Sequence, residues 1–249
     1  MRPRDVLRIG AGSSFADDRI APAVELAERG ELDYLAFECL AERTIARENL
    51  ARLKDPDKGY TPYLAERFQA VLPACIANGI RIVTNMGAAN PLGAARAVRR
   101  EAQALGLPEV PVAVVLGDDV TEAVRANPQL PLMESGEPVE SLLPRMAAAN
   151  AYLGADVVRD ALATGAPVVM TGRVADPSLF LACMLHGLGW RCALQDSACR
   201  KTSFCIRLGE IQAEAAIGIG ADEGIAYLYA TDTVGIGTQA VALLTGSDP

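Results

Sequence analysis

Residues 110–119 read VPVAVVLGDD, and this stretch decides the fold class. Val110 to Leu116 is the most continuous β-branched run of the chain, which predicts a strand buried on both faces. Strands of this kind belong to parallel sheets that helices cover on both sides. A glycine and the acidic pair Asp118-Asp119 follow directly. The chain therefore leaves the predicted sheet through a polar loop.

Similar apolar runs, each followed by a segment with helical spacing, lie on both sides of this strand. Strands are expected at residues 6–10, 34–39, 80–84, 110–116 and 167–170. Helices are expected at residues 20–30, 40–54, 64–77, 90–105 and 151–164, with another beginning at Asp176-Pro177. Right-handed crossovers between successive strands then predict an α/β fold, a mostly parallel sheet flanked by helices and built from successive βα units. The segment 127–139 contains three prolines and a glycine, which predicts a loop or lid.

Composition excludes several classes of protein. The formal net charge of −8 argues against non-specific binding to nucleic acid or to anionic membranes. No apolar stretch reaches the roughly 18 residues of a membrane span, and no signal-like segment follows the charged start. We therefore expect a soluble, cytoplasmic protein. The six cysteines form no C-x-x-C pair and the chain has a single histidine, so we expect reduced thiols and no metal site.

Like the strand at 110–116, the other four expected strands end in polar or glycine-rich turns, and these five turns supply the candidate site. Because the loops after parallel strands line one crevice, residues far apart in the chain should meet there. The predicted catalytic residues are Glu38 and Asp118. The predicted ligand-binding residues are Gly10, Gly12, Ser13, Asn85, Gly87, Thr171, Gly172 and Arg173.

Each of the two predicted catalytic carboxylates could also have a purely structural role. Glu38 ends an otherwise apolar strand, so its carboxylate is either exposed at the crevice or paired. The pair Asp118-Asp119 has the chemistry to hold Mg²⁺ or to act as a base, and aspartate also caps helices, so one of the two is expected to be a cap.

The predicted ligand-binding residues also have both functional and structural interpretations. Arg173 projects from a glycine turn, where a guanidinium binds carboxylate or phosphate, and its replacement by alanine should weaken ligand binding with little loss of stability. Asn85 and the backbone amides of residues 10–13 would polarise a carbonyl, or simply form turns. A dinucleotide cofactor is disfavoured because Phe15 replaces the third glycine of G-x-G-x-x-G. We expect no cofactor.

Several sequence motifs of this chain together resemble those of the acyclic terpene utilisation (AtuA-like) family. The resemblance rests on IGAG at residues 9–12, FECLAERT at 37–44, IVTNMGAANP at 82–91 and TGRVADPSL at 171–179, and covers about residues 6–190. It implies a role in the catabolism of acyclic terpenes such as citronellol and geraniol, which passes through CoA thioesters. It implies no particular reaction and assigns no catalytic residue.

Two functions are therefore expected to compete. The first is a catabolic protein that binds an acyl-CoA or an organic acid at the strand ends, whether or not it is an enzyme. The second is a non-catalytic accessory protein of an acyl-CoA carboxylase pathway. The sequence leaves self-association into a homo-oligomer open.

The resemblance ends near Trp190, which divides the chain into an AtuA-like α/β domain, residues 1–190, and a tail, residues 191–249. Half of the cysteines lie between residues 192 and 205. A change of reading frame, a truncated gene or a divergent tail would each produce such a join.

Overall fold

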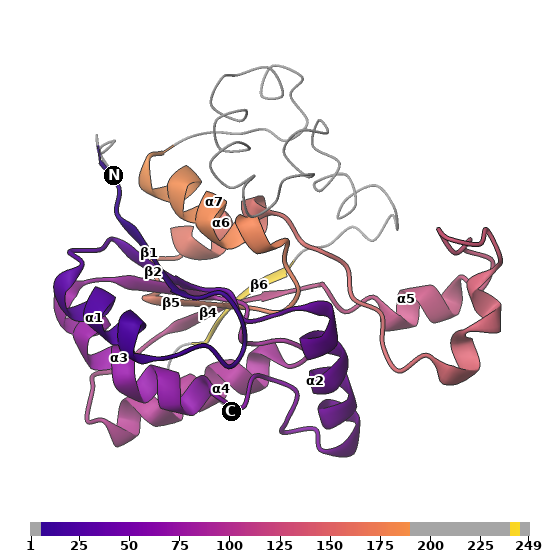
Figure 1. Cartoon of the computed structure of the whole chain (residues 1–249), viewed down its shortest axis with the longest axis horizontal. Coiled ribbons are helices and arrows are strands. Elements are labelled where there is room, and N and C mark those ends of the chain that lie inside the picture. The colour runs from indigo at the N-terminus through magenta and orange to yellow at the C-terminus, as the bar shows by residue number, and fades with distance from the viewer. Residues whose placement is uncertain (1–5, 190–239, 245–249) are drawn as a thin grey trace.

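The computed structural model describes residues 6–189 and 240–244 (Figure 1). Six strands form one sheet in the order β1-β2-β3-β5-β4-β6. Their bounds are β1 (Ile9–Ser13), β2 (Tyr34–Phe37), β3 (Arg81–Thr84), β4 (Val112–Leu116), β5 (Val168–Thr171) and β6 (Ala240–Leu244). Strands β1 to β5 are parallel to one another, and β6 pairs with β4 in the antiparallel sense. The predicted α/β class is confirmed.

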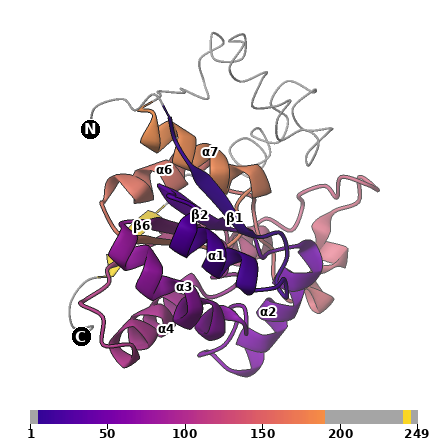
Figure 2. The ribbon, with the colours of Figure 1, turned by 60° about the vertical axis from the view of Figure 1, so that its left-hand side comes forward.

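Helices cover both faces of this sheet. The helices of the described residues are α1 (Ala21–Arg29), α2 (Glu42–Lys54), α3 (Leu64–Asn78), α4 (Pro91–Ala104), α5 (Thr121–Ala126), α6 (Ala155–Ala163) and α7 (Asp176–Gly187), with the short 3₁₀ turns η1 (Val139–Ser141) and η2 (Leu143–Arg145). In Figures 1 and 2, α1, α3 and α4 lie on one face of the sheet and α6 and α7 on the other. The chain changes face after β4, because the connection to β5 runs back across the sheet.

Alternate residues of the strands supply the two cores. In β4, Val112 and Val114 pack with α3 and α4, whereas Ala113 and Val115 pack with α6 and α7. These four side chains are buried, which is why the apolar pattern of this strand is continuous rather than alternating. No helix within the described ranges is long and apolar enough to cross a bilayer.

The strand order creates one switch point. The loop after β3 leads to α4 on one face, and the loop after the neighbouring β5 leads to α7 on the other. In open α/β sheets, ligands bind outside the carboxyl ends of the strands at such a point. The switch point therefore lies at the carboxyl ends of β3 and β5, which Asn85 and Arg173 follow.

One strand boundary differs from the expected one. Strand β1 begins at Ile9 rather than at Val6, so Gly10 and Gly12 lie within the strand and the loop begins after Ser13. The residues around Trp190 and most of the predicted tail lie outside the described residues.

Candidate functional site

Glu38 and Asn85 come together at the carboxyl ends of β2 and β3. Oε1 of the half-buried Glu38 accepts hydrogen bonds from the backbone N–H of Leu40 at 2.8 Å and from Nδ2 of Asn85 at 3.0 Å. Asn85 is fully buried, and its Oδ1 accepts from the N–H of Cys39 at 2.7 Å. The carboxylate is therefore held in one orientation. Within the described residues, its second oxygen, Oε2, has no hydrogen-bond partner.

Ser13 joins the end of β1 to the same place. Its hydroxyl donates to the carbonyl oxygen of Glu38 at 2.9 Å and lies 3.1 Å from Sγ of Cys39. Burial raises the pKa of Cys39 to about 11, although the Arg67 guanidinium and the Ser13 hydroxyl act against it. The thiol therefore stays protonated at neutral pH and is a poor nucleophile.

Arg67 is a buried partner of this cluster that the sequence did not suggest. It lies within α3, is fully buried, and donates to Sγ of Cys39 at 3.0 Å and to the carbonyl of Asp18 at 2.9 Å. Its Nε has no hydrogen-bond partner among the residues that the structure describes. Its position in an otherwise amphipathic helix offers no sequence signal, because Arg67 resembles any solvent-facing arginine until the loop packs over it.

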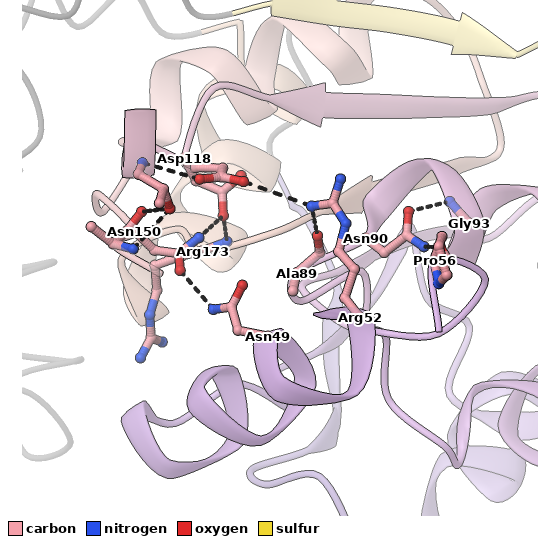
Figure 3. A network of polar contacts seen from close by, with 12 residues as sticks. Asn49, Arg52, Pro56, Ala89, Asn90, Gly93, Asp118, Asn150 and Arg173 are labelled. Carbon is pink, nitrogen blue, oxygen red and sulfur yellow. Dashed lines mark hydrogen bonds and ion pairs between the residues drawn. The ribbon is translucent and has the colours of Figure 1, made fainter. Parts of the chain in front are cut away.

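Asp118 anchors the loop after β5 (Figure 3). Its Oδ2 accepts from the backbone N–H of Arg173 at 2.8 Å and from Nδ2 of Asn150 at 3.1 Å. Asn150 in turn accepts from Nδ2 of Asn49, on α2, at 2.9 Å. The side chain of Asp118 is 4% exposed, and burial raises its pKa to about 6 despite these hydrogen bonds. Asp118 thus links α2, β4 and β5.

The neighbouring Asp119 has the helix-capping character expected of one member of the pair. Its Oδ1 accepts from the N–H of Thr121, the first residue of α5, although the geometric N-cap is Val120. Asp118 and Asp119 therefore have different surroundings. No group of three or more His, Cys, Asp or Glu side chains in the described part of the chain is arranged to hold a metal ion.

Arg173 is 2% exposed, and protein groups surround its guanidinium. Nη1 donates to the carbonyl of Leu40, and Nη2 lies 3.1 Å from Oε1 of Glu42. Asp176 lies 3.7 Å from Nη1, and the guanidinium carbon lies 4.5 Å from the ring centre of Tyr152. The Tyr152 hydroxyl also donates to Glu42. Sequence reasoning missed Glu42 and Tyr152, which are distant in the chain and meet only through the fold.

The predicted glycines allow close approach of backbone and side chains. A Cβ on Gly172 would lie 2.5 Å from Oδ2 of Asp118, and one on Gly87 would lie 2.5 Å from the carbonyl of Thr171. Within β1, a Cβ on Gly12 would lie 2.4 Å from the Phe37 ring. Gly10 is likewise packed against leucine side chains. Packing accounts for all four glycines, and their ligand-binding role stays a prediction.

The strand ends thus hold two adjoining clusters. Ser13, Glu38 and Asn85 form the first, and Asp118 and Arg173 belong to the second. Leu40 bridges them, because its N–H binds Glu38 and its carbonyl binds Arg173. A depression of about 340 Å³ lies elsewhere, next to the residues that precede β4. It is lined by Arg99, Ala102, Gln103, Leu107, Pro108, Glu109 and Val110.

The chain was compared with protein families, curated proteins and solved structures. No curated protein and no solved structure matches the chain. The model of the family described as "Acyclic terpene utilisation family protein AtuA" matches residues 7–198. That span includes β1 to β5 and both clusters of the candidate site. The chain belongs to the acyclic terpene utilisation (AtuA) family.

Proposed function

We propose that this chain acts in the breakdown of acyclic terpenes or related branched acids by binding an acyl thioester at the switch point between β3 and β5. The observation that carries the proposal is the state of Glu38. One carboxylate oxygen is fixed by Asn85 and by the N–H of Leu40, and the other has no partner in the described residues. A fixed carboxylate with a free oxygen is suited to exchange a proton with a ligand.

Of the two predicted carboxylates, Glu38 is the better candidate for this role. Asp118 is almost fully buried, and its Oδ2 already accepts two hydrogen bonds from the protein. We assign Asp118 to positioning the loop that carries Arg173. Glu38 is half-buried and keeps one oxygen free for a proton on the carbon next to a thioester carbonyl.

The charges at this edge of the sheet favour the uncharged carbonyl of a thioester over the carboxylate of a free acid. Arg173, the cation predicted to bind a carboxylate, is already paired with Glu42 and bound to the carbonyl of Leu40. Burial and the negative charges of Glu38 and Glu42 raise the pKa of Asp176 to about 6. A ligand carboxylate would add a further negative charge to this group, whereas a thioester carbonyl would not.

Thermal unfolding of the chain with matched branched acyl-CoA thioesters and free acids tests this proposal. A ligand at 100 times its dissociation constant adds about 2.7 kcal/mol to the unfolding free energy, so binding raises the midpoint clearly. We expect the thioesters to shift the midpoint and the free acids to leave it unchanged. A sharp transition that no thioester shifts would contradict the proposal.

One observation favours the second function, an accessory protein of an acyl-CoA carboxylase pathway. The polar groups of Asp118 and Arg173 are occupied by the protein itself, as in a site that only stabilises a fold. Under that function, purified pathway carboxylase would bind the chain while acyl-CoA would not.

A further inference from the structure

An arm, residues 127–148, projects from the body of the protein beyond α5 (Figures 1 and 2). Its tip is ordered by its own backbone: the N–H of Leu132 donates to the carbonyl of Glu137, and that of Gly136 to Leu132, both at 2.7 Å. The side chain at the tip, Met133, is 78% exposed. The arm is therefore held by its own backbone contacts, and its exposed side chains can be reached by another molecule.

The arm is acidic. It carries Glu134, Glu137 and Glu140, all exposed, and only one cation, Arg145. None of the three glutamates forms an ion pair with another described residue. Their charges are therefore available to a basic surface.

Helix α2 presents such a surface. Arg43, Arg47, Leu50 and Lys54 follow one another at the spacing that places residues on one side of a helix, and all four are exposed. We call these four residues the α2 stripe. Leu50 is 50% exposed, and Leu53 beside it is 67% exposed. Three cations around exposed leucines are unexpected on a chain with a net charge of −8.

The way α2 is attached explains the exposed leucines. The residues that α2 buries are polar, Glu48 and Asn49, and Asn49 binds Asn150. Arg52 donates to the carbonyl of Ala89 from the same helix. Most amphipathic helices attach through an apolar face. Here the polar side of α2 faces the protein, and the side that carries the α2 stripe is exposed.

We infer that the arm of one copy of this chain docks on the α2 stripe of a second copy, and that the contact is repeated in the opposite direction to give a two-fold dimer. The glutamates of the arm face Arg43, Arg47 and Lys54, and Met133 packs against Leu50 and Leu53. Met133, Leu50 and Leu53 are all exposed in one chain, so the arm does not cover its own α2. Each copy carries both surfaces, which a closed two-fold arrangement requires.

Sedimentation velocity on complementary charge variants tests the inference. The arm variant is E134K/E137K and the helix variant is R43E/K54E, which leaves the Arg47–Glu48 pair intact. We expect the wild-type chain to be a dimer that weakens with salt, and each variant alone to dissociate at least tenfold more readily. Mixing the two variants should restore a dimer, because each basic arm then meets an acidic stripe and each acidic arm a basic one.

A matched control keeps the test specific. R96E/R100E changes the charge by the same amount on α4, where both arginines are exposed. It should leave the dimer unchanged. A monomeric wild-type chain at low salt, or variants that do not pair when mixed, would overturn the inference. So would loss of acyl-CoA binding in the helix variant with an unchanged oligomeric state, because the stripe would then serve the phosphates of the ligand.

Discussion

The backbone N–H of Arg173 donates a hydrogen bond of 2.8 Å to Oδ2 of Asp118, and this contact ties the loop after β5 to the end of β4. Gly172 makes the contact sterically accessible, since any Cβ there would collide with the same carboxylate. Asp118, predicted from the sequence to be catalytic, and Arg173, predicted to bind the ligand, are thus partners in a contact that holds two loops together. We therefore expect substitution of either residue to change the free energy of unfolding.

For Asp118, we predict a stability that depends on pH. Burial raises its folded pKa from 3.8 to about 6, so its contribution is fully present below the unfolded pKa and is lost as pH rises through about 6. In the Asp118→Asn variant this dependence is absent. The unfolding free energy of wild type relative to that variant should fall by about 2 kcal/mol between about pH 4.5 and about pH 8. Urea unfolding at the two pH values measures it.

Asp118→Ala provides the comparison. It removes the acceptor of the buried N–H of Arg173 and of the partly buried amide of Asn150, at an expected cost of about 1–3 kcal/mol for the buried donor left unpaired. A difference between wild type and Asp118→Asn that is flat with pH would show that Asp118 is not a buried, titrating carboxylate.

For Arg173, the structure changes the expectation drawn from sequence. Arg173→Ala removes a charged hydrogen bond to the Leu40 carbonyl and the contact with the Tyr152 ring, so we predict a loss of about 2–4 kcal/mol of unfolding free energy. Chemical denaturation measures this loss. Arg29→Ala, which breaks an exposed pair with Glu25, should cost under about 0.5 kcal/mol. Equal losses of unfolding free energy in the two variants would show that the buried contacts of Arg173 do not stabilise the fold.

The fold was predictable because its signals are local. The apolar run at 110–116 and the turns between segments specify strands and helices, and the crossover rule then specifies the sheet. The bounds of β1 were less accessible, since the glycines of IGAG are typical of a turn and also fit a strand packed against Leu32 and Phe37. Local composition does not separate these two structures.

The candidate site was predictable in position but not in partners. The rule that strand ends share one edge of the sheet led us to expect these residues close together, and in the structure Glu38 contacts Asn85 and Asp118 contacts Arg173. Their part in binding or catalysis stays a prediction. That rule does not predict that Glu42 forms an ion pair with the guanidinium of Arg173. That pairing depends on how α2 lies along the edge of the sheet, and α2 is attached by polar contacts that no hydrophobic pattern reveals.

For Glu38, we predict a loss of proton exchange without a loss of fold. Glu38→Gln keeps an oxygen to accept from Asn85 and Leu40, so its unfolding midpoint should stay close to that of wild type. Deuterium incorporation at the α-carbon of a bound acyl-CoA, followed by NMR, should fall by about 100-fold or more. Glu42→Gln removes a neighbouring carboxylate that is outside the proposed chemistry, and it should retain most of the exchange. The same rate in Glu38→Gln as in wild type would exclude Glu38 as the base.

The final prediction concerns His186, whose contribution to stability should vary with pH in the opposite sense from that of Asp118. Nδ1 of His186 lies 2.6 Å from the Tyr34 hydroxyl, and Nε2 lies 3.4 Å from Arg81. Burial, and then the Arg81 charge, lower its pKa below the ordinary 6.5. The stability that the neutral ring contributes is therefore present above the unfolded pKa and is lost as pH falls.

Because His186 is the single histidine of the chain, one imidazole signal in an NMR titration reports its pKa directly. We expect a midpoint below 6.5 in the wild-type chain. In Arg81→Gln the midpoint should rise but stay below 6.5, because burial, the larger cause, remains. A wild-type midpoint at or above 6.5 would mean that water reaches the ring, and that α7 does not close over Tyr34 as the structure has it.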